Sequence, residues 1–232
     1  MSFLVNIEGI DGSGKGTQAA RLQARLRDRA LRVELISFPR YQETHFGRKV
    51  ADFLNGRFGE LSEVNPFLAS LLYAGDRFES KTWLERMAAE NDVVILDRYV
   101  PSNMAHQASK LEGRERTELI EWIETIEFGV YGLPRPNLCI LLDIPPRHAQ
   151  RLISLKAPRD YTDHAADLQE SDSEHLTRAR EAYLELAKHR SEWQIVPCVQ
   201  NDQVRPPEEI EAVIWDLVEQ KLEMLNVGTV LS

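Results

Sequence analysis

The sequence of 232 residues has little of several residue types that mark specialised protein classes. Its two cysteines, Cys139 and Cys198, lie in apolar runs without CxxC or His-rich spacing, which argues against a zinc site or a disulfide framework and predicts small buried side chains. With 12 Gly and 11 Pro the chain is neither fibrous nor of low complexity. No apolar run approaches the roughly 20 residues of a membrane span, and the first residues lack the basic start of a signal peptide. These absences predict a soluble, cytoplasmic protein.

The charge balance is acidic, with 28 Lys+Arg against 37 Asp+Glu and a net charge of −9. This balance argues against a general nucleic-acid or anionic-membrane surface, so we expect any phosphate site to be local. One segment separates its charges: four cations precede six acids. This pattern indicates either a solvated helix end and loop or a phosphate-binding flap. The cations are Arg147, Arg151, Lys156 and Arg159, and the acids are Asp160, Asp163, Asp167, Glu170, Asp172 and Glu174.

Short apolar runs alternate with longer amphipathic segments, which is typical of a parallel α/β sheet with crossover helices. The five predicted strands are Phe3–Ile7, Val33–Phe38, Val93–Leu96, Leu138–Leu142 and Ile195–Val199. The predicted helical segments are Thr17–Ala30, Phe46–Asn55, Asn65–Glu90, Pro101–Phe128, His175–His189 and Pro207–Leu225. No repeat or flexible linker divides the chain, so we expect a single domain over residues 1–232.

A glycine-rich loop follows the first predicted strand and satisfies the pattern GxxxxGK at a strand-to-helix junction. Glycines let the backbone approach an anion, and Lys15 can reach the terminal phosphates of a nucleoside triphosphate. Gly16 stands where the general motif has the Ser or Thr that binds magnesium, so we expect the metal to depend more on water, the nucleotide and a carboxylate such as Asp11 or Asp97. The predicted loop residues are Gly9, Ile10, Asp11, Gly12, Ser13, Gly14, Lys15, Gly16 and Thr17.

The third predicted strand delivers Asp97 and Arg98 at its carboxyl end, which is the edge where ligands bind in open α/β sheets. The pair is either a simple ion pair or, beside a phosphate loop, a site at which the planar guanidinium of Arg98 meets a second phosphate group.

Several motifs occur in one order and spacing along nearly the whole chain. They are Glu8-Gly9-x-Asp11-x-x-Gly14-Lys15, Phe38-Pro39-Arg40-Tyr41, Leu72-Tyr73-Ala74-Gly75-Asp76-Arg77, Asp97-Arg98-Tyr99-x-x-Ser102-Asn103, Gly132-Leu133-Pro134-Arg135-Pro136 and Asp167-x-x-Glu170. In this set the chain resembles the thymidylate kinases, P-loop enzymes that phosphorylate dTMP to dTDP. The resemblance implies the P-loop kinase fold, a five-stranded parallel sheet with helices on both faces, together with a homodimer and a lid at about residues 154–170.

The resemblance also implies roles for individual residues. Lys15 and the loop backbone would hold ATP, with Arg151 and Lys156 beside it. The dTMP site would comprise Asp11, Phe38, Arg40, Tyr73, Arg77, Arg98, Ser102, Asn103 and Gln169. Magnesium would meet Asp11, Asp97 and Glu170. His106 stands where some relatives have Tyr.

Tyr73 and Arg77 are four residues apart and share a helix face, which would place an aromatic plane for thymine beside a donor for its O4. The alternative is that Tyr73 is core and that Arg77 pairs with a nearby acid. The other five histidines, His45, His148, His164, His175 and His189, accompany no nucleophile pattern and are interpreted as scattered surface residues.

The chemistry implied is direct in-line phosphoryl transfer without a general base, because a phosphate monoester with a second pKa of about 6 is already largely deprotonated at neutral pH. The phosphate loop lacks an arginine before Lys15, so we expect the lid to supply one, with Arg159 as the first choice. Two alternatives stay open at this point. One is another nucleotide kinase, such as an adenylate or deoxynucleoside kinase, and the other is a nucleotide-binding regulator without turnover.

Overall fold

The computed structural model describes residues 2–60, 63–154 and 172–225. Its centre is a sheet of five strands in the order β2-β3-β1-β4-β5, and every neighbouring pair is parallel. The strands are β1 (Phe3–Glu8), β2 (Val33–Ser37), β3 (Val93–Asp97), β4 (Leu138–Asp143) and β5 (Trp193–Pro197). The apolar runs of the sequence therefore form the parallel sheet that was predicted, because strands covered on both faces need continuous apolar side chains.

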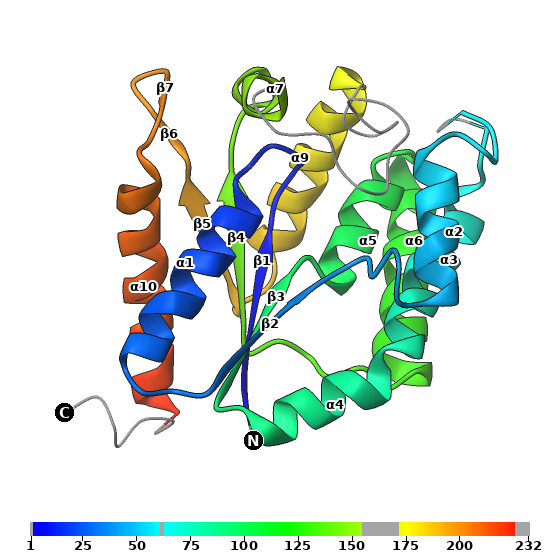
Figure 1. The fold of residues 1–232 in the computed structure, drawn as a ribbon. Helices are drawn as coiled ribbons and strands as arrows, with labels where there is room; N and C mark the ends of the chain where they lie inside the picture. Colours follow the sequence, from blue (N-terminus) through cyan, green and yellow to red (C-terminus); the bar gives the residue numbers. More distant parts are fainter. Residues whose placement is uncertain (1, 61–62, 155–171, 226–232) are drawn as a thin grey trace.

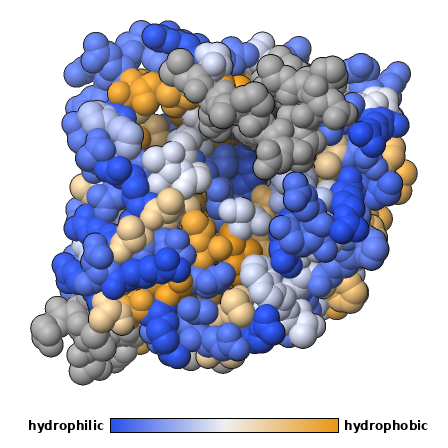
Figure 2. All heavy atoms as spheres, viewed as in Figure 1, coloured by the Kyte–Doolittle hydropathy of each residue, from blue (hydrophilic) through white to orange (hydrophobic). Residues whose placement is uncertain are grey.

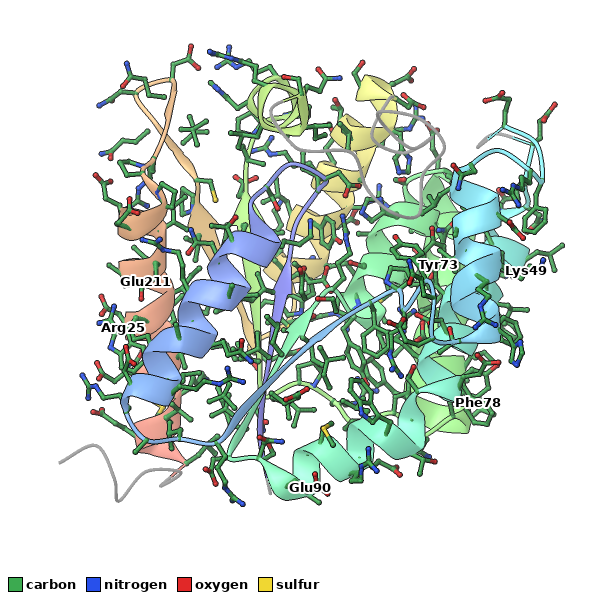
Figure 3. The ribbon with its side chains drawn as sticks, in the orientation of Figure 1. Arg25, Lys49, Tyr73, Phe78, Glu90 and Glu211 are labelled. Carbon is green, nitrogen blue, oxygen red and sulfur yellow. The ribbon has the colours of Figure 1, made fainter. Side chains whose placement is uncertain are left out.

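Helices cover both faces of this sheet (Figure 1). Helices α1 and α10 pack together on one face, α5 and α9 pack together on the other, and α2, α3 and α6 form a further layer beyond α5 (Figure 1). Arg25 of α1 and Glu211 of α10 reach toward one another between their helices, 2.8 Å apart (Figure 3). The helices are α1 (Lys15–Asp28), α2 (His45–Leu54), α3 (Pro66–Glu79), α4 (Lys81–Glu90), α5 (Val100–Ala108), α6 (Gly113–Glu124), the π-helix η1 (Thr125–Val130), α7 (Pro146–Ser154), α9 (Ser173–Lys188) and α10 (Pro207–Met224).

Two long helical segments of the sequence are broken in the structure. The segment Asn65–Glu90 divides at Ser80, whose hydroxyl donates to the Asp76 carbonyl at 2.9 Å, and α4 then starts in a new direction. The segment Pro101–Phe128 divides after α5, where Gly113, the first residue of α6, takes a φ of 53°. Amphipathic spacing continues across both breaks, so it predicted one helix where the chain turns.

The last strand is also displaced from its prediction. β5 is Trp193–Pro197, two residues earlier than expected, and Val199 belongs to an unpredicted hairpin of β6 (Val199–Gln200) and β7 (Gln203–Val204). Asn201 and Asp202 form its turn with φ values of 51° and 61°, a conformation that these two residue types tolerate.

Buried cysteines are confirmed, because Cys139 and Cys198 are 3% and 1% exposed. The surface prediction for the histidines is confirmed for His45 and His189. It is wrong for His148 and His175, which are buried, because their polar ring atoms have hydrogen-bond partners: His175 contacts the buried His106, and His148 contacts the exposed carboxylate of Asp202. His164 lies outside the described residues. Among the described helices, none is both long enough and apolar enough to cross a membrane.

Candidate active site

The phosphate loop leaves the carboxyl end of β1 and enters α1 at Lys15, at the upper edge of the sheet in Figure 1. Gly12 and Gly14 have φ values of 82° and 90°, a left-handed conformation that favours glycine. A Cβ atom on Gly12 would lie 2.3 Å from the carbonyl oxygen of Ala149. Glycine at this position therefore lets α7 close directly onto the loop.

Lys15 curls back over the loop that precedes it. Its Nζ atom donates to the carbonyl oxygens of Gly9 and Ile10, both at 2.9 Å, and its side chain is buried. The ammonium group is thus held at the concave side of the loop, next to backbone N–H groups at the start of a helix. This combination binds anions, because a helix N-terminus carries partial positive charge and unpaired donors.

Gly16 and Asp97 lie close together. A Cβ atom on Gly16 would stand 3.3 Å from Oδ2 of Asp97, so the space that a Ser or Thr side chain would need adjoins a carboxylate. The described residues contain no cluster of three or more His, Cys, Asp or Glu side chains suited to a metal. A magnesium ion does not need one, since it usually keeps several waters and takes one or two carboxylates together with substrate phosphates.

Arg98 follows β3 with a φ of 65°, an uncommon conformation for a residue with a side chain, while its N–H donates to the Ile7 carbonyl at 3.1 Å. Its Nη2 pairs with Oδ1 of Asp11 at 2.5 Å, so the ion pair joins Arg98 to the phosphate loop and not to Asp97. Burial is the largest single influence and works to lower the pKa of Arg98, but the surrounding acidic groups, led by Asp11, together outweigh it and the pKa is raised well above its ordinary value. The guanidinium is therefore fixed and permanently charged.

Both cations belong to one hollow of about 410 Å³ at this edge of the sheet. The hollow connects the phosphate loop with the carboxyl ends of β2 and β3. Figure 2 shows the protein from the same side as Figure 1. Polar side chains cover most of this face, and apolar ones gather toward its middle. The lining residues are Asp11, Gly12, Gly14, Lys15, Gly16, Thr17, Ser37, Phe38, Pro39, Tyr41, Asp97 and Arg98.

A second group of predicted residues lies between α3, α5 and η1. Arg77 donates through Nε and Nη2 to Glu127, and both side chains are at most 2% exposed. Asn103 donates to the same carboxylate at 2.9 Å and to the Ser70 carbonyl at 3.0 Å. Arg77 therefore pairs with a nearby acid, which was the alternative to a direct role in base recognition. Its Nη1 atom takes no part in the two bonds to Glu127.

Tyr73 lies one turn before Arg77 on α3 and is 9% exposed. Its ring meets that of Phe53 edge to face at 6.4 Å, and it points toward the middle of the molecule, whereas Lys49 lies at the outer edge (Figure 3). The shared helix face predicted for Tyr73 and Arg77 is present, and both side chains are buried on it.

The remaining predicted residues are not brought together with these. Arg40 stacks its guanidinium 4.0 Å over the ring of Trp83 and donates to Ser80 at 3.2 Å, outside the hollow. Arg151 is exposed at the end of α7. Four predicted residues lie outside the described residues: Lys156, Arg159, Gln169 and Glu170.

Glu8 belongs to the first motif of the sequence, but no role was predicted for it. Glu8 is fully buried at the end of β1 and accepts from the Tyr99 N–H, from Ser102 and from Tyr183. Burial raises the pKa of Glu8, and the hydroxyl donors oppose this. A charged residue ending a buried strand directly before the glycine loop was the available signal. Ser102, predicted at the dTMP site, links Glu8 to Arg98, its Oγ being 2.6 Å from Glu8 and 3.2 Å from Arg98 Nη1.

Sequence and fold comparisons relate this chain to known proteins. The family model described as thymidylate kinase matches residues 7–205. The thymidylate kinase of Mycobacterium tuberculosis is 34% identical over 185 residues, 80% of this chain and 86% of that protein. A probable thymidylate kinase of Thermococcus gammatolerans is 34% identical over 227 residues, 96% of this chain and 98% of that protein. The structure of thymidylate kinase from Candida albicans has the same fold, with a TM-score of 0.70 at 22% identity, covering 94% of this chain and 92% of that one.

Proposed function

The chain belongs to the thymidylate kinase family, and from this premise we propose how its residues divide the work of transferring a phosphoryl group from ATP to dTMP, which gives ADP and dTDP. The observation that carries the proposal is that Lys15 and Arg98 line one hollow from two neighbouring strands. Lys15 and the loop amides serve the phosphates of ATP. Arg98, held by Asp11, serves the phosphate of dTMP.

The reaction needs alignment and charge neutralisation more than proton transfer. The acceptor phosphate of dTMP is largely dianionic at neutral pH, because its second pKa is about 6. Two anionic groups must therefore approach in line, and fixed cations lower the cost of that approach. Arg98 suits this task because its ion pair with Asp11 at 2.5 Å fixes its position without making it neutral.

Magnesium is the expected companion of ATP in such a site, and Asp97 would hold it directly or through water. The ion would neutralise charge on the phosphates. The placement of Asp97 beside Gly16 supports this assignment, since a carboxylate takes the place of the hydroxyl that the general motif supplies. Asp11 was also predicted to bind the metal. Because its carboxylate is paired with Arg98, we assign the metal to Asp97 instead.

Thymine would bind beside Tyr73 and Arg77, with Asn103 completing the group. Their burial on adjoining helices supports a closed base site. Glu127 then orients Arg77 through two bonds and leaves Nη1 directed elsewhere. Lys156 and Arg159 remain our proposal for the cations that act on ATP from the lid, with Arg159 at the transferring phosphoryl group.

A second copy of the chain is the proposed partner, and nucleic acid is not, given the net charge of −9. Apolar side chains on α3 and α6 support a homodimer: Leu68 is 66%, Phe78 51% and Trp122 37% exposed. Phe78 lies at the outer side of this helical layer (Figure 3). We place the enzyme in the cytoplasm, the compartment that its two free buried cysteines suit.

An acceptor panel tests the activity. ADP release is measured by a coupled assay with ATP and magnesium, using dTMP, dUMP, AMP and thymidine in turn. We expect turnover with dTMP to exceed that with AMP or thymidine. A preference for AMP would indicate an adenylate kinase, and release of ADP with no acceptor would indicate a different use of the loop.

Arg98→Ala tests the division of the site. We expect a higher Michaelis constant for dTMP and lower turnover, with a much smaller effect on the Michaelis constant for ATP. A collapse of ATP affinity with dTMP affinity retained would mean that the two phosphate sites are exchanged.

A further inference from the structure

Two histidines that the mechanism does not use lie in contact behind Arg98. His106 belongs to α5 and His175 to the first turn of α9, and they are 4% and 1% exposed. Nδ1 of His106 is 3.2 Å from Nε2 of His175, and the ring centroids are 5.4 Å apart. On its other side, Nε2 of His106 is 3.2 Å from Nη1 of Arg98. The two rings thus form a path from the phosphate-binding arginine to the start of α9.

The direction of every hydrogen bond in this path follows from Arg98. A guanidinium only donates, so Nε2 of His106 must accept and Nδ1 must carry the proton. That proton points at His175, whose Nε2 must therefore also accept. Nδ1 of His175 then carries its proton toward Ser109 Oγ at 3.4 Å, and this hydroxyl donates to the His106 carbonyl at 2.8 Å. Each ring N–H then has one acceptor, and the path is complete only when both rings are neutral.

The surrounding charges favour neutral rings. Burial is the main cause that lowers the pKa of both histidines, that of His175 to about 4 and that of His106 well below its ordinary value. The neighbouring cations act in the same direction and the neighbouring carboxylates oppose them. Around His106 these groups are Arg98, Lys15 and Asp11, and around His175 they are Lys110, Arg178, Asp11 and Asp172. Tyr183 meets His106 edge to face at 5.8 Å and stays protonated.

We propose that His106 and His175 are positioning residues for Arg98, a neutral pair with both protons on Nδ1 that holds the guanidinium toward the acceptor phosphate. Asp11 fixes Nη2 of Arg98 from the phosphate loop, and His106 fixes Nη1 from α5, where Ser102 Oγ also lies 3.2 Å from Nη1. The guanidinium plane is then defined by two supports on different elements. His175 orients the His106 ring, because its Nε2 accepts the proton on Nδ1 of His106 and so leaves Nε2 of His106 as the acceptor for Arg98.

The kinetic test uses pairs of variants that separate hydrogen bonding from packing. His106→Gln keeps an amide oxygen that can accept from Arg98, whereas His106→Leu fills the space without an acceptor. We expect His106→Leu to lower kcat/KM for dTMP about tenfold, the loss of one charge-assisted hydrogen bond, with the Michaelis constant for ATP unchanged. His106→Gln should recover most of this. His175→Gln and His175→Leu should repeat the pattern more weakly, and His189→Gln, at an exposed histidine, should behave as wild type.

Equal losses in the Gln and Leu variants would overturn the proposal, and so would a loss that falls equally on ATP and dTMP. This test rests on the proposed role of Arg98, so a second measurement is independent of activity. The ¹⁵N shifts of the histidine rings in the whole protein at pH 7 report which nitrogen of each ring carries the proton. Protons on both Nδ1 atoms support the pair, whereas a proton on either Nε2, or a charged ring, overturns it. If Arg98→Ala leaves dTMP binding unchanged while the shifts are as expected, the role of Arg98 has failed and the neutral pair has not.

Discussion

Glu127→Gln is the substitution for which the structure gives the clearest magnitude. It removes one negative charge from a side chain that is fully buried and is bonded to Arg77 twice and to Asn103 once. The glutamine is nearly isosteric, so the shape of the core is retained. What changes is that the guanidinium of Arg77, 1% exposed, loses its compensating charge inside the protein.

Breaking a buried ion pair from one side usually costs about 3–5 kcal/mol, because an uncompensated charge remains in a poorly solvated place. The glutamine oxygen can still accept one hydrogen bond from Arg77, so we expect the lower end, about 3 kcal/mol. For a chain of this length that corresponds to a fall in Tm of roughly 6–12 °C. The Michaelis constant for dTMP should also rise, since Arg77 loses the partner that orients it.

The assay is urea unfolding of wild type and variant, followed by circular dichroism. Glu118→Gln is the matched control, because Glu118 pairs with Arg114 on the surface of α6 with side chains 48% and 90% exposed. We expect that control to change the free energy of unfolding by less than about 0.5 kcal/mol. Arg77→Met combined with Glu127→Gln should be more stable than Glu127→Gln alone. A loss below about 1 kcal/mol for Glu127→Gln, or a double variant that is no better, would refute the reasoning.

Three further outcomes are expected. Lys15→Ala should abolish phosphoryl transfer while the circular dichroism spectrum is unchanged, and wild-type turnover would contradict the phosphate-loop assignment. Arg159→Ala should lower turnover at least about a hundredfold with little change in dTMP binding by calorimetry, and near-normal turnover would show that the cations of this segment are only a solvated surface. The free energy of unfolding should fall as the pH drops from about 6.5 to about 4, because His175 has a pKa of about 4 when folded and binds its proton more readily when unfolded. This histidine alone would contribute about 3 kcal/mol, and a smaller slope in His175→Gln checks the assignment.

The sequence by itself determined the parallel sheet and the phosphate loop. Buried parallel strands need runs of apolar residues, and a loop that wraps phosphates needs glycine where the backbone turns left-handed and approaches another chain segment, as at Gly12. Both requirements are local, so residues that are neighbours in the sequence are enough to reveal them. The position of Arg98 at the carboxyl end of β3 followed from the same local pattern, and the structure places it beside the loop.

Only the tertiary structure decided which polar groups meet. Arg77 and Glu127 are 50 residues apart, and His106 and His175 are 69 apart. Neither pair has a spacing that periodicity can detect, since each depends on how α3, η1, α5 and α9 pack. For the same reason Asp11 became the partner of Arg98 in place of Asp97, and Arg40 turned to Trp83. A buried polar atom needs a partner, and which residue provides it depends on how the helices pack and not on the neighbouring sequence.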